Sequence, residues 1–211
     1  MRRITGLLFC LCLIMCCGCG KVSNDYFPME VGTSWKYKAA GTSLSGKVEV
    51  RATEEEKLDE GKAIIFEVKK ESADEVDSEL FEKREDGIYS YKRVHPALGF
   101  IETNLTPPQL YLKLPLKVGD SWKWEGKMFG MKGSFESAVE SKEKVSVGNR
   151  SYDCFKVVER GTTSDGRSLT DKRWYAGGVG LVKEESAVVL TNESGEVHTL
   201  ELLEYKGLEK K

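Results

Sequence analysis

Most of the chain alternates between apolar and polar residues with a period of two, in short runs separated by turn residues. In the segment TSWKYKA, Trp35, Tyr37 and Ala39 share one face and lysines occupy the other. The segments KVEVRA, AIIFEVK and YDCFKVV repeat the pattern. Such alternation is typical of antiparallel strands with one buried face. It predicts an all-β domain, an antiparallel meander of about ten strands that forms a barrel or a strongly curved sheet to cover its edges.

A decapeptide near the start of this domain recurs later in the chain. The segment PMEVGTSWKY begins at Pro28, and PLKVGDSWKW begins 87 residues later at Pro115. In both, a glycine permits a tight turn, and two large rings follow on one face of a strand. The match predicts two related halves, residues 26–92 and 113–207, within a single domain of residues 26–207. A chance match between two short segments is the alternative.

An apolar segment with four prolines, VHPALGFIETNLTPPQLYLKLP, lies between these halves. Pro107 and Pro108 argue against a central strand there, because proline lacks the amide hydrogen that a strand ladder needs. The segment is therefore predicted to be a linker. It would serve as a lid or docking loop over an apolar cavity, or as a crossover that closes one end of the core.

The N-terminus, MRRITGLLFCLCLIMCCGCGK, combines two arginines, an apolar run and a small-residue end. This is the organisation of an export signal, and the apolar run is too short for a permanent membrane span. The cysteine that closes it resembles the lipobox of bacterial lipoproteins. The resemblance implies a signal peptide at residues 1–18, acylation of Cys19 with fatty acids such as palmitate, and a lipidated tether at residues 19–25.

Three cysteines compete for the lipid. Cys19 is favoured because Gly18 supplies the small preceding residue, and Cys16 and Cys17 are the alternatives. An ordinary secretory signal or an uncleaved anchor is the competing interpretation. Because Gly20 rather than aspartate follows Cys19, the resemblance implies the outer membrane, facing the periplasm, if the source is Gram-negative.

Three further segments resemble a group of uncharacterised bacterial lipoproteins. They are YFPMEVGTSWKYK, VSVGNRSYDCFKV and RWYAGGVGLVKEE. The group's patterns are YFPxxVGxxWxY and WYAxGVGLVK, and the resemblance extends over most of residues 26–205. It implies a β-rich envelope protein, distantly similar to the lipoprotein carriers of the LolA/LolB type. It implies no activity and no functional residues.

Composition excludes several classes of protein. Removing Arg2 and Arg3 with the signal leaves 30 of the 32 basic residues against 34 acidic ones, a net charge of about −4. A nucleic-acid-binding protein would show a basic excess instead. Five of the six cysteines lie at or before Cys19, so Cys154 has no partner for an internal disulfide.

No motif predicts catalysis. The only histidines are His95 and His198, and no pair of histidines or cysteines has metal-ligand spacing. The glycines around Val179 resemble a dinucleotide loop only superficially, because a strand pattern and not a helix follows them. The sequence therefore predicts a protein that is not an enzyme and has no cofactor or metal.

The remaining hypothesis is a binding module for an apolar ligand or an envelope partner. Large aromatic residues on inward faces would line its cavity. An alternative is a structural or assembly lipoprotein with a filled core, in which these rings only pack and a surface patch around Leu98, Phe100 and Tyr111 binds partners. The predicted cavity residues are Trp35, Tyr37, Trp122, Trp124, Phe129 and Trp174.

Overall fold

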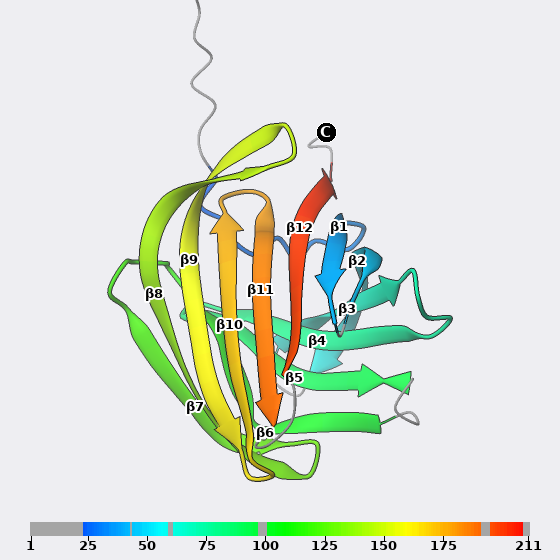
Figure 1. Ribbon diagram of the computed structural model, residues 1–211, viewed down its shortest axis with the longest axis vertical. Helices are drawn as coiled ribbons and strands as arrows, with labels where there is room; N and C mark the ends of the chain where they lie inside the picture. The colour runs from blue at the N-terminus through cyan, green and yellow to red at the C-terminus, as the bar shows by residue number, and fades with distance from the viewer. Residues whose placement is uncertain (1–22, 43, 59–60, 97–100, 191–194, 209–211) are drawn as a thin grey trace, which may run out of the picture.

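The computed structural model describes residues 23–42, 44–58, 61–96, 101–190 and 195–208. Within them, twelve antiparallel strands form one closed barrel, with each strand beside its sequence neighbours and β1 completing the ring against β12 (Figure 1). This confirms the predicted all-β antiparallel meander. The strands are β1 (Ser34–Gly41), β2 (Gly46–Leu58), β3 (Gly61–Lys70), β4 (Val76–Arg84), β5 (Gly87–His95), β6 (Ile101–Lys113), β7 (Ser121–Met128), β8 (Met131–Val147), β9 (Arg150–Thr163), β10 (Arg167–Ala176), β11 (Gly180–Leu190) and β12 (Glu196–Lys206).

The strand number is twelve rather than about ten, because two segments without clean alternation are also strands. The charged stretch around Val76 forms β4. The proline-rich segment forms β6, so the prediction of a linker there was wrong for residues 101–113. Residues 97–100 of that segment lie outside the described residues.

Strand β6 accommodates its prolines by giving up backbone pairing. Its ladder with β5 shifts register between Ser90 and Lys92, which skips the proline pair. With β7 it shares a single described pair, Thr106 with Lys127. Two indoles bridge this seam instead: Trp122 donates to the carbonyl of Leu110 at 2.9 Å, and Trp124 donates to the carbonyl of Pro107 at 2.9 Å. Proline is therefore tolerated because side-chain donors replace the missing ladder.

The two copies of the decapeptide form the same turn. Before β1, the amide of Gly32 donates to Ala52, that of Thr33 to Glu30, and that of Ala52 to Thr33. Before β7 the same three bonds recur 87 residues later, from Gly119 to Val139, Asp120 to Lys117, and Val139 to Asp120. Both turn glycines have a positive φ, 98° at Gly32 and 93° at Gly119, which glycine adopts without strain.

The start of the domain and the end of its last strand lie at the same end of the barrel (Figure 1). The turns before β1 and β7, the β10–β11 turn at residues 177–179 and the end of β12 all lie there, since the strands alternate in direction. We call this the upper end, and the opposite end, with the β7–β8 turn, the lower end. Residues 23–33, blue in Figure 1, run across the upper end before β1 begins.

Candidate functional site

An apolar cavity of about 130 Å³ lies inside the barrel near the upper end. Its walls come from β1, β2, β3, β4, β11 and β12, which contribute mostly aromatic and aliphatic side chains at this level of the barrel. The polar side chains among its lining are Glu79, Tyr37, Tyr111 and Tyr175. The apolar lining consists of Phe27, Pro28, Trp35, Val50, Phe66, Val68, Phe81, Leu181 and Leu200, with Gly180.

Residues 23–28, which we call the strap, contribute Phe27 and Pro28 to the cavity wall. Phe27 inserts its ring among Phe66, Phe81 and Tyr111, with ring centroids 5.6, 5.2 and 5.9 Å away. The tilted and edge-on orientations are those that aromatic pairs prefer. Phe27 therefore forms part of the cavity wall and comes from outside the strands.

Two polar contacts fix the strap on the barrel. The amide of Gly178 donates to the carbonyl of Asp25 at 2.7 Å, and Lys83 pairs with the carboxylate of Asp25 at 2.9 Å. The strap also passes so close to Gly177 that a β-carbon there would lie 2.0 Å from the carbonyl oxygen of Ser23. Only glycine permits this approach. The packed part of the chain thus includes residues 23–25, which belong to the predicted tether.

The two aromatic residues of β1 present only carbon to the cavity. The indole of Trp35 donates to the carbonyl of Val179 at 2.6 Å, and the hydroxyl of Tyr37 donates to that of Leu181 at 3.0 Å. Burial, followed by the charge of Glu184, raises the pKa of Tyr37 well above its ordinary value. Both polar atoms are therefore satisfied, so the rings form an apolar wall.

The floor of the cavity is polar. Tyr111 and Tyr175 lie there beside Glu79, which pairs with Arg93. Burial raises the pKa of Tyr111 to about 12 and that of Tyr175 well above its ordinary value, so both phenols are neutral at physiological pH. A neutral phenol donates hydrogen bonds and is not a base at this pH.

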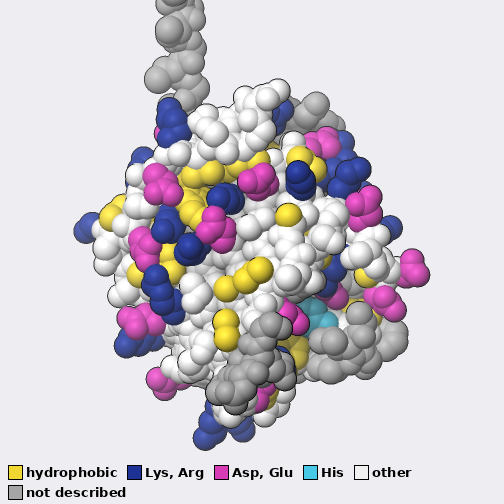
Figure 2. Space-filling view, in the orientation of Figure 1, with side chains coloured by type: hydrophobic (Ala, Val, Ile, Leu, Met, Phe, Trp, Pro, Cys, Tyr) yellow, Lys and Arg dark blue, Asp and Glu magenta, His cyan; other side chains and the backbone are white. Residues whose placement is uncertain are grey.

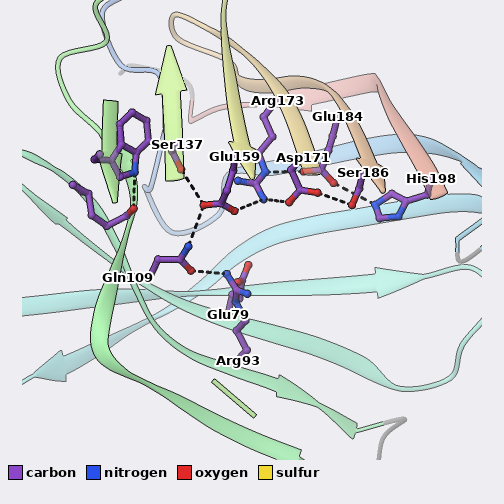
Figure 3. A network of polar contacts seen from close by, with 12 residues as sticks. Glu79, Arg93, Gln109, Ser137, Glu159, Asp171, Arg173, Glu184, Ser186 and His198 are labelled. Carbon is purple, nitrogen blue, oxygen red and sulfur yellow. Dashed lines mark hydrogen bonds and ion pairs between the residues drawn. The ribbon is translucent and has the colours of Figure 1, made fainter. Parts of the chain in front are cut away.

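Below the floor, a network of charged and polar side chains crosses the barrel interior (Figure 3). Arg173 stands at its centre, near Glu159 at 3.5 Å and Glu184 at 3.1 Å, and it also pairs with Asp171. Figure 3 shows the members converging from eight strands: Glu79 of β4, Arg93 of β5, Gln109 of β6, Ser137 of β8, Glu159 of β9, Asp171 and Arg173 of β10, Glu184 and Ser186 of β11, and His198 of β12.

Further hydrogen bonds satisfy the carboxylates of this network. Glu159 accepts from Gln109 at 3.2 Å and from Ser137 at 3.0 Å. Ser186 donates to Asp171 at 2.6 Å, and the imidazole of His198 lies 3.3 Å from Glu184. Buried carboxylates need such partners, because an unpaired buried charge is strongly destabilising.

The network environment raises the pKa of some of its members and lowers the pKa of others. Burial would lower the pKa of Arg173, but Tyr111, Asp171 and Glu159 raise it well above its ordinary value. Burial raises the pKa of Asp171. For Glu184 burial acts in the same direction, but His198 and Arg173 outweigh it and lower the pKa. Arg173 is therefore a permanent cation that holds the surrounding carboxyl groups.

The structure brings together only two of the six predicted cavity residues, Trp35 and Tyr37. Trp122 and Trp124 face inward but bridge the seam between β6 and β7. Trp124 packs in a separate small core with Leu105 and Phe135. The rings of Trp122 and Trp124 close the barrel at this seam and therefore do not line the cavity.

The other two predicted residues lie elsewhere. Phe129 sits in the β7–β8 turn at the lower end, where its ring is 5.6 Å from that of His95. Trp174 lies on the outer face, because its neighbours Arg173 and Tyr175 point inward and strand residues alternate. The ammonium groups of Lys156 and Lys183 lie over its ring, 5.8 and 4.9 Å from the centroid, and its indole donates to Glu143 at 2.5 Å.

The alternative hypothesis named three residues for a surface patch, and the structure describes one of them. Tyr111 lies inside the barrel and lines the cavity, so it is not part of a surface patch. Leu98 and Phe100 lie outside the described residues.

Cys154 is fully buried, and burial raises its pKa to about 12. Among the described residues, no group of three or more potential ligands could hold a metal ion, and no helix could span a membrane.

The charged interior was not predicted from the sequence. Arg173 and Glu159 occupy the inward phase of their strands, with Tyr175 and Phe155 respectively, but charged positions are ordinarily assigned to solvent. The one available signal was the phase of RSLTDKRWYA, in which Asp171, Arg173 and Tyr175 alternate. Phe27 was also missed, since it precedes the first strand.

No family model matches the chain, and no curated protein matches it. Among solved structures, a Bacteroides fragilis NCTC 9343 protein inferred to be exported, with a YmcC-like fold, is 12% identical with a TM-score of 0.47. A Parabacteroides distasonis ATCC 8503 protein inferred to be a lipoprotein is 15% identical with a TM-score of 0.40. Each match covers 86% of this chain and 98% of the other. Likenesses of this strength carry no inference about function.

Proposed function

We propose that this protein is a bacterial envelope lipoprotein, anchored by lipid at Cys19, whose barrel is a non-enzymatic binding module for an apolar ligand. The observation that carries the binding proposal is the cavity of about 130 Å³, whose walls are aromatic and aliphatic and whose ring polar atoms are already bonded. The lipobox-like cysteine supports the anchor, and the residue after it, Gly20, favours the outer membrane, facing the periplasm, if the source is Gram-negative.

The size of the cavity limits the ligand. An apolar cavity of about 150 Å³ is large enough to bind benzene, whereas pockets for drug-sized molecules measure about 300–1,000 Å³. The cavity therefore accepts one ring or a short hydrocarbon segment while Phe27 is in place. Displacement of the Phe27 ring would make room for a longer chain.

The chemistry of the site supports binding and not catalysis. The tyrosines of the floor are neutral, and the carboxylates of the network are held by arginines and hydrogen bonds. None of these groups is poised to take a proton from a ligand. The floor instead offers hydroxyl groups that could orient a polar end of an otherwise apolar molecule.

Native mass spectrometry of residues 20–211, purified from a bacterial periplasm without detergent, tests the binding proposal. We expect an excess mass that disappears on organic extraction. The variant Val50→Phe fills the cavity and should lose this mass, whereas Val189→Phe, at an exposed position, should keep it. A clean mass that stays unchanged after incubation with envelope lipids would contradict the proposal and favour the alternative of a filled core acting through its surface.

A further inference from the structure

We infer that the upper end of the barrel rests on the surface of the membrane that holds the lipid anchor. This inference depends on the proposed acylation of Cys19. It assigns a lipid bilayer as the partner of one defined surface. The surface consists of the two repeated turns, at Val31 and Val118, and the neighbouring Leu208.

The first argument is the length of chain between the lipid and the barrel. Ser23 lies against the β10–β11 turn at the upper end, in contact with the position of Gly177. Only residues 20–22 separate Ser23 from Cys19. Four residue spacings reach at most about 14 Å, even when fully extended. The upper end therefore cannot move farther than this from the lipid headgroups while the strap is docked.

The second argument is what this end exposes. Val31 is 43% exposed, Val118 is 47% exposed and Leu208 is 56% exposed. Leu208 lies beside Gly32, since a β-carbon on that glycine would be 3.3 Å from the Leu208 side chain. Of the other large apolar side chains exposed among the described residues, Val189 and Val197 lie towards the lower end and Leu203 lies on β12. Single exposed valines are ordinary, so their arrangement decides the question.

The third argument is that arrangement. In the ring of twelve strands, β1 and β7 lie opposite each other. The turn of Val31 precedes β1 and the turn of Val118 precedes β7, and both turns carry the same three hydrogen bonds. Two equivalent apolar points therefore stand on opposite sides of the same end. A surface that touches both must extend across the upper end and not along the barrel wall.

The barrel wall fits a different environment. Figure 2 shows basic and acidic side chains interspersed over the face formed by β8 to β12, with apolar side chains between them. Ion pairs on this wall include Lys156 with Glu140 at 3.0 Å and Lys172 with Glu185 at 3.2 Å. A wall of mixed charge is suited to water. The upper end also carries charged pairs, such as Lys83 with Asp25 at 2.9 Å, but it adds exposed valines to them. This combination fits an apolar–aqueous boundary, where apolar side chains enter the headgroup region.

Four matched valines test the inference in the full lipidated protein. Val31→Cys and Val118→Cys report on the upper end, and Val189→Cys and Val197→Cys, of 47% and 46% exposure in the parent, report on the lower part. Each is labelled with a polarity-sensitive fluorophore and bound to vesicles of phosphatidylethanolamine and phosphatidylglycerol. Cys154 does not compete for label, because it is fully buried. Iodide in the water is the quencher.

We expect vesicle binding to protect the labels at positions 31 and 118 from iodide and to shift their emission to the blue. The labels at 189 and 197 should remain quenched. If the protein floats with the vesicles and all four labels are quenched equally, the docking inference is wrong and the anchor stands. If protein made with its full N-terminus carries no lipid and does not float, the anchor at Cys19 is wrong, and the docking inference fails with it.

Discussion

Replacing Arg173 with methionine should destabilise the barrel far more than the loss of an ordinary ion pair. Arg173 is 9% exposed and contacts three carboxylates, those of Glu159, Asp171 and Glu184. Methionine keeps much of the side-chain volume but removes the cation. Because removal of one partner leaves buried charge without compensation, we expect a loss of about 4 kcal/mol in the free energy of unfolding. For a chain of this size, that loss lowers the melting temperature by roughly 8–16 °C.

The pH dependence of this loss separates electrostatics from packing. Without Arg173, burial should raise the pKa values of the carboxyl groups around it above their unfolded values. A group with a raised folded-state pKa stabilises the protein below its unfolded pKa and loses that contribution as the pH rises through the folded pKa. The destabilisation of Arg173→Met should therefore be larger at pH 7.5 than at pH 5. A cavity or packing defect would give the same loss at both values.

Urea denaturation followed by tryptophan fluorescence measures this loss at each pH. The matched control is Arg167→Met, because Arg167 is 48% exposed and its pair with Asp165 spans 3.0 Å at the surface. Exposed pairs contribute about 0–1 kcal/mol, so the control should change little. A loss below about 1 kcal/mol for Arg173→Met, or a loss independent of pH, would refute the reasoning that Arg173 holds the interior carboxylates.

Three further predictions concern other parts of the barrel. Trp124→Phe leaves the carbonyl of Pro107 without its donor, so it should cost about 1–2 kcal/mol and speed hydrogen exchange in β6 and β7; unchanged exchange there would show that the indole does not close the seam. Gly161→Ala places a β-carbon 2.1 Å from the ring of Phe135, so it should cost about 1–3 kcal/mol by urea denaturation, and a variant as stable as the parent would contradict this packing. Cys154, with a pKa of about 12 and no exposed surface, should resist thiol reagents at pH 8 until urea unfolds the chain, and rapid native labelling would count against its burial.

Period-two alternation predicted the fold class because it reports directly which strand face is buried. It identified β1, β2 and β3 from their apolar positions. It failed for β6. The prolines of that strand are tolerated because indole groups from β7 donate to its carbonyls, and the sequence of the segment alone does not reveal these donors. Proline does lack the amide hydrogen that a strand ladder needs, but in β6 this weakens the ladder and does not prevent the strand.

The candidate site was predicted less well, for a related reason. Trp35 and Tyr37 follow from the local pattern, since they begin a strand with two rings on its inward face. Trp174 was placed on the wrong face, because an aromatic ring was preferred over Arg173 as the inward residue. Whether a buried arginine is tolerated depends on carboxylates from β9 and β11, strands whose register is a property of the whole barrel.

The strap has one more consequence, which concerns distance and not affinity. The same few residues carry Phe27 into the cavity and connect the barrel to the cysteine proposed to bear the lipid. While Phe27 is docked, the segment that connects Cys19 to the barrel ends at Ser23 and spans about 14 Å at most; once residues 23–28 are released, it ends at Met29 and spans about 36 Å at most. A ligand that displaces the Phe27 ring would thus lengthen this connection more than twofold. Occupancy of the cavity would then set how far the barrel can travel from its membrane.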